Sequence, residues 1–257
     1  MKNMYYLYFS IKNRFSLKID FFGALCLSIL TMLLTSLYFK SFFNYTSSLG
    51  GLNKYEIIIL YLTSTSQVML VNSFTYSIYN FFHEVQQGKI EPIITKPISI
   101  YVVMFFRWFS IVQFILFVIT IISLLLYIHF TSELYIRQNK LLVFCMYYLI
   151  GFILNICYIT IMESLTYILK RQIQTAFIFS ELSRIMQIPL LILPQKLIYG
   201  LVIFFPAIIS SALATNALFH ESFYMYDYLS LLTTIVTISI TIYLHNILRS
   251  KFNGHGG

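Results

Sequence analysis

Six long runs of apolar residues divide the chain, each about long enough to cross a lipid bilayer as a helix. They cover residues 21–39, 57–82, 101–128, 141–169, 173–193 and 228–248. The hydrocarbon core of a bilayer requires about 20 apolar residues per helix. The pattern therefore predicts an all-α, polytopic membrane protein with six transmembrane helices.

A further apolar stretch at 197–213 contains Gly200 and Pro206 and could form a seventh span. With six spans and both termini in the cytoplasm, ten basic residues fall in cytoplasmic segments and five in outer segments, as the positive-inside rule requires. A seventh span would move Arg249 and Lys251 outside. We therefore expect 197–213 to form a re-entrant outer piece between spans 5 and 6, buried in protein or lining a cavity.

The beginning of the chain is amphipathic. Apolar residues share one helical face and basic or polar residues lie largely on another: Met4, Leu7, Tyr8, Ile11 and Phe15 against Lys12, Asn13 and Arg14. This predicts an interfacial helix over 1–18, although the same residues could extend the first span into the cytoplasm. We expect a single transmembrane domain over 1–257, with the six-span bundle at 19–252 and a flexible tail at 253–257.

Composition supports the membrane assignment. Only 10% of the residues are charged and the mean hydropathy is +0.80, whereas a soluble domain contains about 25% charged residues. The net charge of +8 would suggest nucleic acid in a soluble protein, but here the basic residues separate apolar runs. They indicate orientation in a lipid bilayer rather than binding to nucleic acid.

The sequence offers no catalytic, metal or cofactor motif. It has no GxxxxGK[ST] loop, no GxSxG or HExxH motif and no pair of cysteines at ligand spacing. No internal repeat supports the inverted-repeat plan of secondary transporters. We therefore expect a chain that is not itself an enzyme and holds no metal.

One polar stretch, residues 83–99, separates the second and third apolar runs. The second span is expected to continue through Gln87 and to end at Gly88 as its C′ residue. Pro92 can occupy the first turn of a new short helix, and Pro97 ends it. The result would be a rigid rod across the membrane face, tied to a span at each end; the residues also allow an ordinary helix–helix connection.

Charged residues also occur within the apolar runs. Glu181 and Arg184 lie at i,i+3 in the fifth span and can pair, and Glu163 lies in the fourth. An unpaired charge in hydrocarbon costs about 2.5–3.5 kcal/mol, so these side chains should face the protein interior. They could line a cavity, a subunit interface or a proton path, or they could hold helices in register. Because they form no continuous chain across the membrane, we favour structure or interface.

The polar stretch resembles the first cytoplasmic loop of type-2 ABC exporter permeases. The matching residues, in order and spacing, are Glu84, Gly88, Ile90, Ile93, Ile94, Pro97 and Ser99. A second region resembles the proline-punctuated stretch after the fifth span of that family, through Pro189, Pro194 and Pro206. The chain departs from the family at Gln86, where a basic residue is frequent, and at 212–214, where an aromatic–proline pair is usual.

The resemblance implies a cytoplasmic coupling helix between spans 2 and 3 that docks on a separate ATPase. The implied contact residues are Glu84, Gln86, Gly88, Ile90, Glu91, Pro92, Ile93, Ile94 and Pro97. It also implies an outer gate near Pro189, Pro194 and Pro206. ATP and Mg²⁺ would bind to two copies of the ATPase, and a second permease subunit, identical or related, would complete the transporter.

The implied function is export of an amphipathic or hydrophobic small molecule, such as a drug, antimicrobial or lipid-like compound. The implied location is the bacterial plasma (inner) membrane, crossed several times, with both termini in the cytoplasm. One alternative is a membrane accessory or immunity protein without transport. Another is an ion-coupled secondary transporter with a relay through Glu163 and Glu181.

Overall fold

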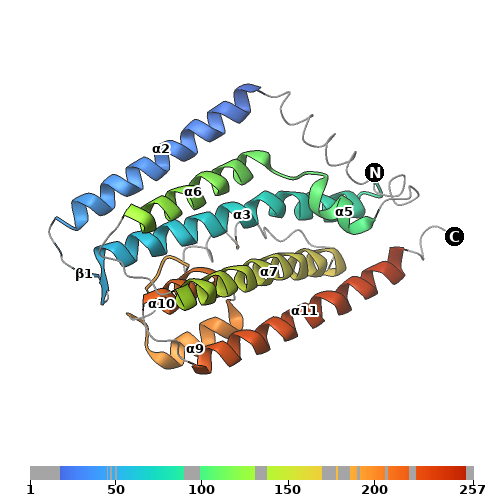
Figure 1. Cartoon of the computed structure of the whole chain (residues 1–257). Coiled ribbons are helices and arrows are strands. Elements are labelled where there is room, and N and C mark those ends of the chain that lie inside the picture. Colours follow the sequence, from blue (N-terminus) through green and yellow to red (C-terminus); the bar gives the residue numbers. More distant parts are fainter. Residues whose placement is uncertain are drawn as a thin grey trace.

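The computed structural model describes residues 18–44, 46, 48–49, 51–89, 99–130, 138–169, 178, 186–189, 192–205, 208–219 and 224–252. Nearly all of these are helical, which confirms a mostly helical membrane protein (Figure 1). The elements in chain order are α2 (Lys18–Phe42), β1 (Ser48–Leu49), β2 (Leu52–Asn53), α3 (Lys54–Gln86), α5 (Ile100–Phe106), α6 (Ile111–Phe130), α7 (Gln138–Leu169), α9 (Gln195–Phe204), the π-helix η2 (Ile209–Leu213), α10 (Ala214–Phe219) and α11 (Tyr224–Phe252).

Within the described residues, four helices are long and apolar enough to cross a membrane: α3, α6, most of α7 and most of α11. The first predicted span, 21–39, lies within the 25-residue α2. The predicted fifth span, 173–193, falls largely outside the described residues, as do the proposed interfacial helix and the tail. The count of six spans therefore stays a prediction.

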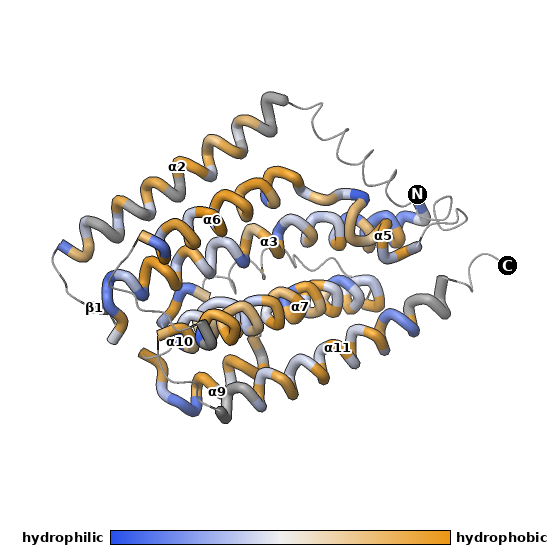
Figure 2. The backbone as a smooth tube through the Cα atoms, in the orientation of Figure 1, coloured by the Kyte–Doolittle hydropathy of each residue, from blue (hydrophilic) through white to orange (hydrophobic). Residues whose placement is uncertain are grey.

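Helix α3 is the centre of the bundle. It packs against both α6 and α7, α11 packs on α7, and α2 lies outermost beside α6 (Figure 1). Figure 2 shows that α3 is more polar than α6, and much of that polar surface, including Ser66 and Gln67, is fully buried. Large apolar side chains instead lie on the outside: Leu27 of α2 and Ile235 of α11 are each 66% exposed. An apolar exterior around a partly polar interior suits a protein surrounded by lipid.

The ends of the helices fall into two groups. One end of the bundle contains the start of α2, the end of α3, α5 and the end of α11 (Figure 1). The opposite end contains α9 and α10 (Figure 1). In the first group, the Tyr101 ring of α5 stacks on the His245 ring of α11 at 4.7 Å between centroids, which joins these two helices. A small turn at the second end closes on Gly51, whose φ is 81°, and pairs Leu49 with Leu52.

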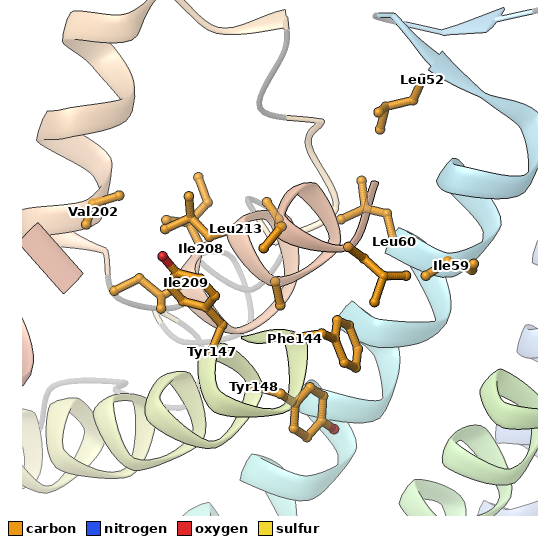
Figure 3. Packing of buried hydrophobic residues seen from close by; sticks show 14 of the residues in the cluster. Leu52, Ile59, Leu60, Phe144, Tyr147, Tyr148, Val202, Ile208, Ile209 and Leu213 are labelled. Atoms are coloured by element: carbon orange, nitrogen blue, oxygen red, sulfur yellow. The ribbon is translucent and has the colours of Figure 1, made fainter. Parts of the chain in front are cut away.

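The stretch predicted to be re-entrant is divided between α9 and η2. With 10 and 5 residues, neither is long enough to cross a bilayer. The π-helix is entirely buried and packs against α3 and α7. Figure 3 shows its contact with α3: Ile208, Ile209 and Leu213 belong to the same apolar cluster as Leu60. Entry of this segment from the outer leaflet stays a prediction.

The third apolar run, 101–128, is not one continuous helix as the sequence predicted. Helix α5 ends at Phe106 and α6 begins at Ile111, so residues 107–110 form a break. The run contains no proline or glycine that would signal this break. Its cause is tertiary and lies in α3, as described below.

The contact between η2 and α7 depends on Gly151. A Cβ added at Gly151 would lie 2.5 Å from the Cα of Ser210, closer than backbone and side chain can approach. We predict that Gly151→Ala lowers the stability of the detergent-solubilised protein by about 1–3 kcal/mol, because the two helices must separate. Thermal unfolding measures this.

Gly200→Ala is the matched control, because a Cβ at Gly200, in α9, meets nothing within 4 Å. Its effect should be neutral or stabilising, by up to about 1 kcal/mol, since alanine favours helix. Equal loss of stability in both variants would contradict the close packing of η2 on α7.

Candidate functional site

Helix α3 ends in a Schellman motif built on Gly88. Gly88 has φ +68°, its N–H donates to the carbonyl of Val85 at 3.1 Å, and the Lys89 N–H donates to the carbonyl of Glu84 at 3.0 Å. This is the pattern in which C′ and C″ residues satisfy the last helical carbonyls, and it confirms Gly88 as the C′ residue. Glycine is suited to this position because other L residues are strained at positive φ.

The Glu84 side chain, one turn before that end, is bound by two residues of the break between α5 and α6. An Arg107 Nη donates to Glu84 Oε2 at 2.5 Å, and Trp108 Nε1 donates to Glu84 Oε1 at 3.2 Å. The guanidinium also lies 5.8 Å from the centroid of the Trp108 ring, within the range of a cation–π contact. We call Glu84, Arg107 and Trp108 the carboxylate joint.

The carboxylate joint is only partly exposed, with 25% of the Arg107 side chain and 13% of the Glu84 side chain accessible. Both oxygens of the carboxylate are engaged by separate donors on one neighbouring segment. Charge-assisted hydrogen bonds of this kind are stronger than neutral ones. The end of the second span and the beginning of the third are therefore held together, on both sides of the polar loop.

Backbone contacts strengthen the same connection. The break leaves N–H groups without a partner in their own helix, and two of them donate to α3: Trp108 N–H to Ser77 Oγ at 3.1 Å and Ser110 N–H to the Ser73 carbonyl at 2.9 Å. In a bilayer, backbone N–H groups must find acceptors inside the protein. The acceptors on α3 therefore allow the helix to break at 107–110.

Aromatic packing completes the connection between the break and α3. The Phe74 ring of α3 contacts the Phe105, Phe106 and Phe109 rings at centroid distances of 6.3, 5.9 and 5.0 Å. These are edge-on contacts, which are favourable between aromatic rings. Residues 73–84 of α3 thus contact residues 105–110 through backbone, charge and aromatic groups.

Of the residues expected to contact an ATPase, three are described. Glu84 is in the joint, and Gln86 and Gly88 are exposed at the end of α3. Ile90, Glu91, Pro92, Ile93, Ile94 and Pro97 lie outside the described residues. The structure thus describes the attachment of the expected coupling helix to span 2, and the helix itself stays a prediction.

Three of the other predicted residues, Glu163, Pro189 and Pro194, are described by the structure. Glu163 is 2% exposed inside the bundle, on α7, as expected for a charge within an apolar run. Pro189 is buried, Pro194 is the exposed N-cap of α9, and Glu181, Arg184 and Pro206 fall outside the described residues. Among the described residues, no group of three His, Cys, Asp or Glu side chains could hold a metal ion.

Arg107, Trp108, Ser73 and Ser77 were not predicted to belong to this site. One feature of the sequence pointed to this contact. Arg107 and the chain's single tryptophan are adjacent a few residues after the polar stretch 83–99, and the oppositely charged Glu84 lies at its start. The backbone contacts with Ser73 and Ser77 had no such signal, because serine is common in α3.

Comparison with known proteins gives one match. The family model described as ABC-2 family transporter protein matches residues 28–256. No curated protein and no solved structure matches the chain. The matched region includes the whole carboxylate joint and the polar loop.

We predict that Glu84→Gln and Arg107→Gln each lower the free energy of unfolding by about 1.5–3 kcal/mol, because each leaves the other partner of a charge-assisted bond unmatched. The double variant should lose less free energy of unfolding than the two single variants combined. Thermal unfolding of the unmodified protein, both single variants and the double variant measures this difference as a coupling energy. Glu56→Gln is the control, because Glu56 forms an exposed capping bond with the Asn53 N–H at the other end of α3. Additive losses at 84 and 107 would mean that the ion pair contributes no stability.

Proposed function

Because the chain belongs to the ABC-2 transporter family, as the match over 28–256 shows, we propose that it is the permease subunit of an ATP-driven exporter. Members of this family are multi-pass membrane proteins that work with ABC ATPase partners and are generally not enzymes themselves. The exporter would contain two ATPase subunits, which hold the ATP and Mg²⁺, and a second permease subunit, identical or related.

The observation that carries the proposal is the carboxylate joint. It connects α3 to the α5–α6 break on either side of the loop expected to dock on the ATPase. A displacement of that loop would therefore move both spans together. With a loose connection, the loop could move while the spans stay in place. Networks of hydrogen bonds, ion pairs and packed side chains of this kind can carry coupling between distant sites.

Helix α3 can carry the displacement across the membrane. Its 33 residues extend about 50 Å, from the joint to the opposite end, where Leu60 packs against η2 and α10. Closure of the ATPase subunits would thus bias the position of α3 against the buried π-helix. In this proposal the two positions correspond to inward-open and outward-open states of the permease.

The same geometry supports an orientation in the membrane. The end of α3, which carries Glu84 of the joint, lies toward the same end of the bundle as the start of α2 and the end of α11 (Figure 1). With the joint in the cytoplasm beside the ATPase, both termini are cytoplasmic, in agreement with the distribution of basic residues. We propose a bacterial plasma membrane location on this basis.

The nature of the buried surface supports an amphipathic or hydrophobic substrate. Among the described residues, Glu163 is the one charged side chain in the buried set, and the other buried polar residues are serine, threonine, asparagine and glutamine. A neutral interior suits a molecule with few charges, such as a drug, antimicrobial or lipid-like compound. It does not suit a relay of titratable groups across the membrane.

We predict that the partner ATPase co-purifies with this chain and that its ATP hydrolysis is stimulated in the complex. Glu84→Gln should reduce that stimulation about tenfold or more, because loss of roughly 1.4 kcal/mol of coupling corresponds to one factor of ten. ATP hydrolysis by reconstituted complexes measures it.

The control is again Glu56→Gln, which makes the same chemical change on the same helix at the far end. It should retain normal stimulation. A Glu84→Gln complex that forms, and hydrolyses ATP as fast as the unmodified one, would contradict the proposed role of the joint. A chain that is active without any ATPase would contradict the exporter.

A further inference from the structure

A stacked pair of rings attaches α11 to the segment that follows the polar loop. Tyr101 is the second residue of α5, and its ring lies 4.7 Å from the His245 ring of α11, measured between centroids. The two ring planes are inclined by 27°. A separation of this size is within the range of favourable aromatic stacking, so the contact can hold the two helices in one arrangement.

The stack lies close to the end of the polar loop. Ser99, the last residue of that loop, is the N-cap of α5. Its carbonyl accepts hydrogen bonds from the N–H groups of Val102 and Val103 at 3.0 and 3.3 Å. Tyr101 is therefore in the first turn of a hydrogen-bonded helix, so that a displacement of Ser99 also displaces the Tyr101 ring.

Other side chains of α5 pack on α3. Val103 and Met104 are each 3% exposed and belong to an apolar cluster that also contains Phe81 and Val85 of α3. Tyr101, in contrast, is 50% exposed. The short helix is thus attached to the end of α3 by its buried residues and to α11 by the Tyr101 ring.

Helix α11 leads from the stack to the opposite end of the bundle. It packs mainly on α7 and α9, and its packing against α5 is slight by comparison. Near its start, Leu229 packs against the apolar cluster that contains Val202 of α9 and Ile209 of η2. Leu229 and His245 are about 24 Å apart along the helix axis. A displacement of the His245 end can therefore reach the same cluster to which Leu60 of α3 belongs.

The tyrosines of α11 show what aromatic residues at a membrane surface look like without such a contact. Tyr228 and Tyr243 are 75% and 67% exposed, as expected of rings that lie among lipid headgroups. His245 comes two residues after Tyr243, on another face of the helix, and is partly buried. Its contact with Tyr101 thus differs from the general aromatic belt of a membrane protein.

We propose that Tyr101 and His245 are positioning residues that form a second connection from the polar loop, through which α11 follows the movement of α5. We call this pair the ring joint. The carboxylate joint makes α3 and the break move with the loop, and the ring joint extends the movement to α11. The loop then acts on the apolar cluster at the opposite end along two helices. The cause of the movement rests on the proposed transport function, and the test separates the two.

Removal and replacement of the rings, in the complex with its ATPase, is the first half of the test. Tyr101→Ala and His245→Ala should each reduce the stimulation of ATP hydrolysis about two- to tenfold, as loss of one aromatic contact implies. The double variant should lose no more than the more severe single variant, because both residues act through one contact. Tyr101→Phe and His245→Phe keep a ring and should keep most of the stimulation. Tyr243→Ala removes an exposed ring from the same helix and should be normal.

Cross-linking is the second half, and it separates transmission of movement from stability. The native cysteines are replaced by alanine, and Tyr101→Cys is combined with His245→Cys. A short bifunctional methanethiosulfonate joins the two thiols, and a reducing agent releases them. Stimulation should be low before cross-linking, rise about twofold or more after it, and fall again on reduction. Tyr101→Cys combined with Tyr243→Cys is the control and should cross-link about tenfold more slowly, because residue 243 is on another face of α11.

Folded alanine variants with normal stimulation would overturn the proposal, and so would additive losses in the double variant. Equal stimulation before and after cross-linking, or a pair at 101 and 245 that cross-links no faster than the control, would overturn it as well. Rapid cross-linking, with an ATPase that even the unmodified chain does not stimulate, would support the link between α5 and α11 and contradict the exporter. If His245→Ala does not fold, His245→Leu carries the same comparison.

Discussion

The interaction on which the proposed coupling depends is the ion pair of the Glu84 carboxylate with Arg107, together with the hydrogen bond that Trp108 donates to it. A carboxylate at the end of a membrane helix requires strong partners, and here both come from one neighbouring segment. That segment is itself a break in a helix, and the N–H groups of Trp108 and Ser110 in it donate to Ser77 and Ser73 of α3. Charge and backbone constraints therefore stabilise the same contact, so neither α3 nor the break is complete without the other.

The polar and apolar residues are distributed as the lipid environment demands. The exposed surfaces of α2 and α11 are apolar, and polar groups gather inside along α3. Most buried hydroxyls donate to carbonyls of their own helix, which allows serine and threonine to occur in a span without a partner helix. Among the described residues of α3, Thr63, Thr65 and Gln67 are buried side chains that have no hydrogen-bond partner.

The sequence was sufficient for features with local causes. Periodicity and length predicted α2, α3, α7 and α11, and a glycine after a polar helix end predicted the C′ position of Gly88. The break at 107–110 could not be predicted, because its residues favour a continuous span and its stability comes from Ser73 and Ser77, more than 30 residues earlier. The π-helix was not predicted either: it packs closely on Gly151 of α7, a contact that a local reading of 209–213 does not include. Glu84 was predicted as a site residue because of the loop that it begins. Its partners Arg107 and Trp108, on the other side of that loop, were identified only in the structure.

The account makes the carboxylate joint, rather than Glu84 alone, responsible for transmitting movement from the ATPase. Reversal of the ion pair tests this most directly, through ATP hydrolysis by complexes that carry Glu84→Lys, Arg107→Glu or both. Each single reversal places like charges together and should abolish the stimulation of the ATPase, whereas the double reversal restores an opposite pair and should recover a substantial part of it. A folded double variant that is as inactive as the single variants, or single variants that keep full stimulation, would contradict the central role of the joint.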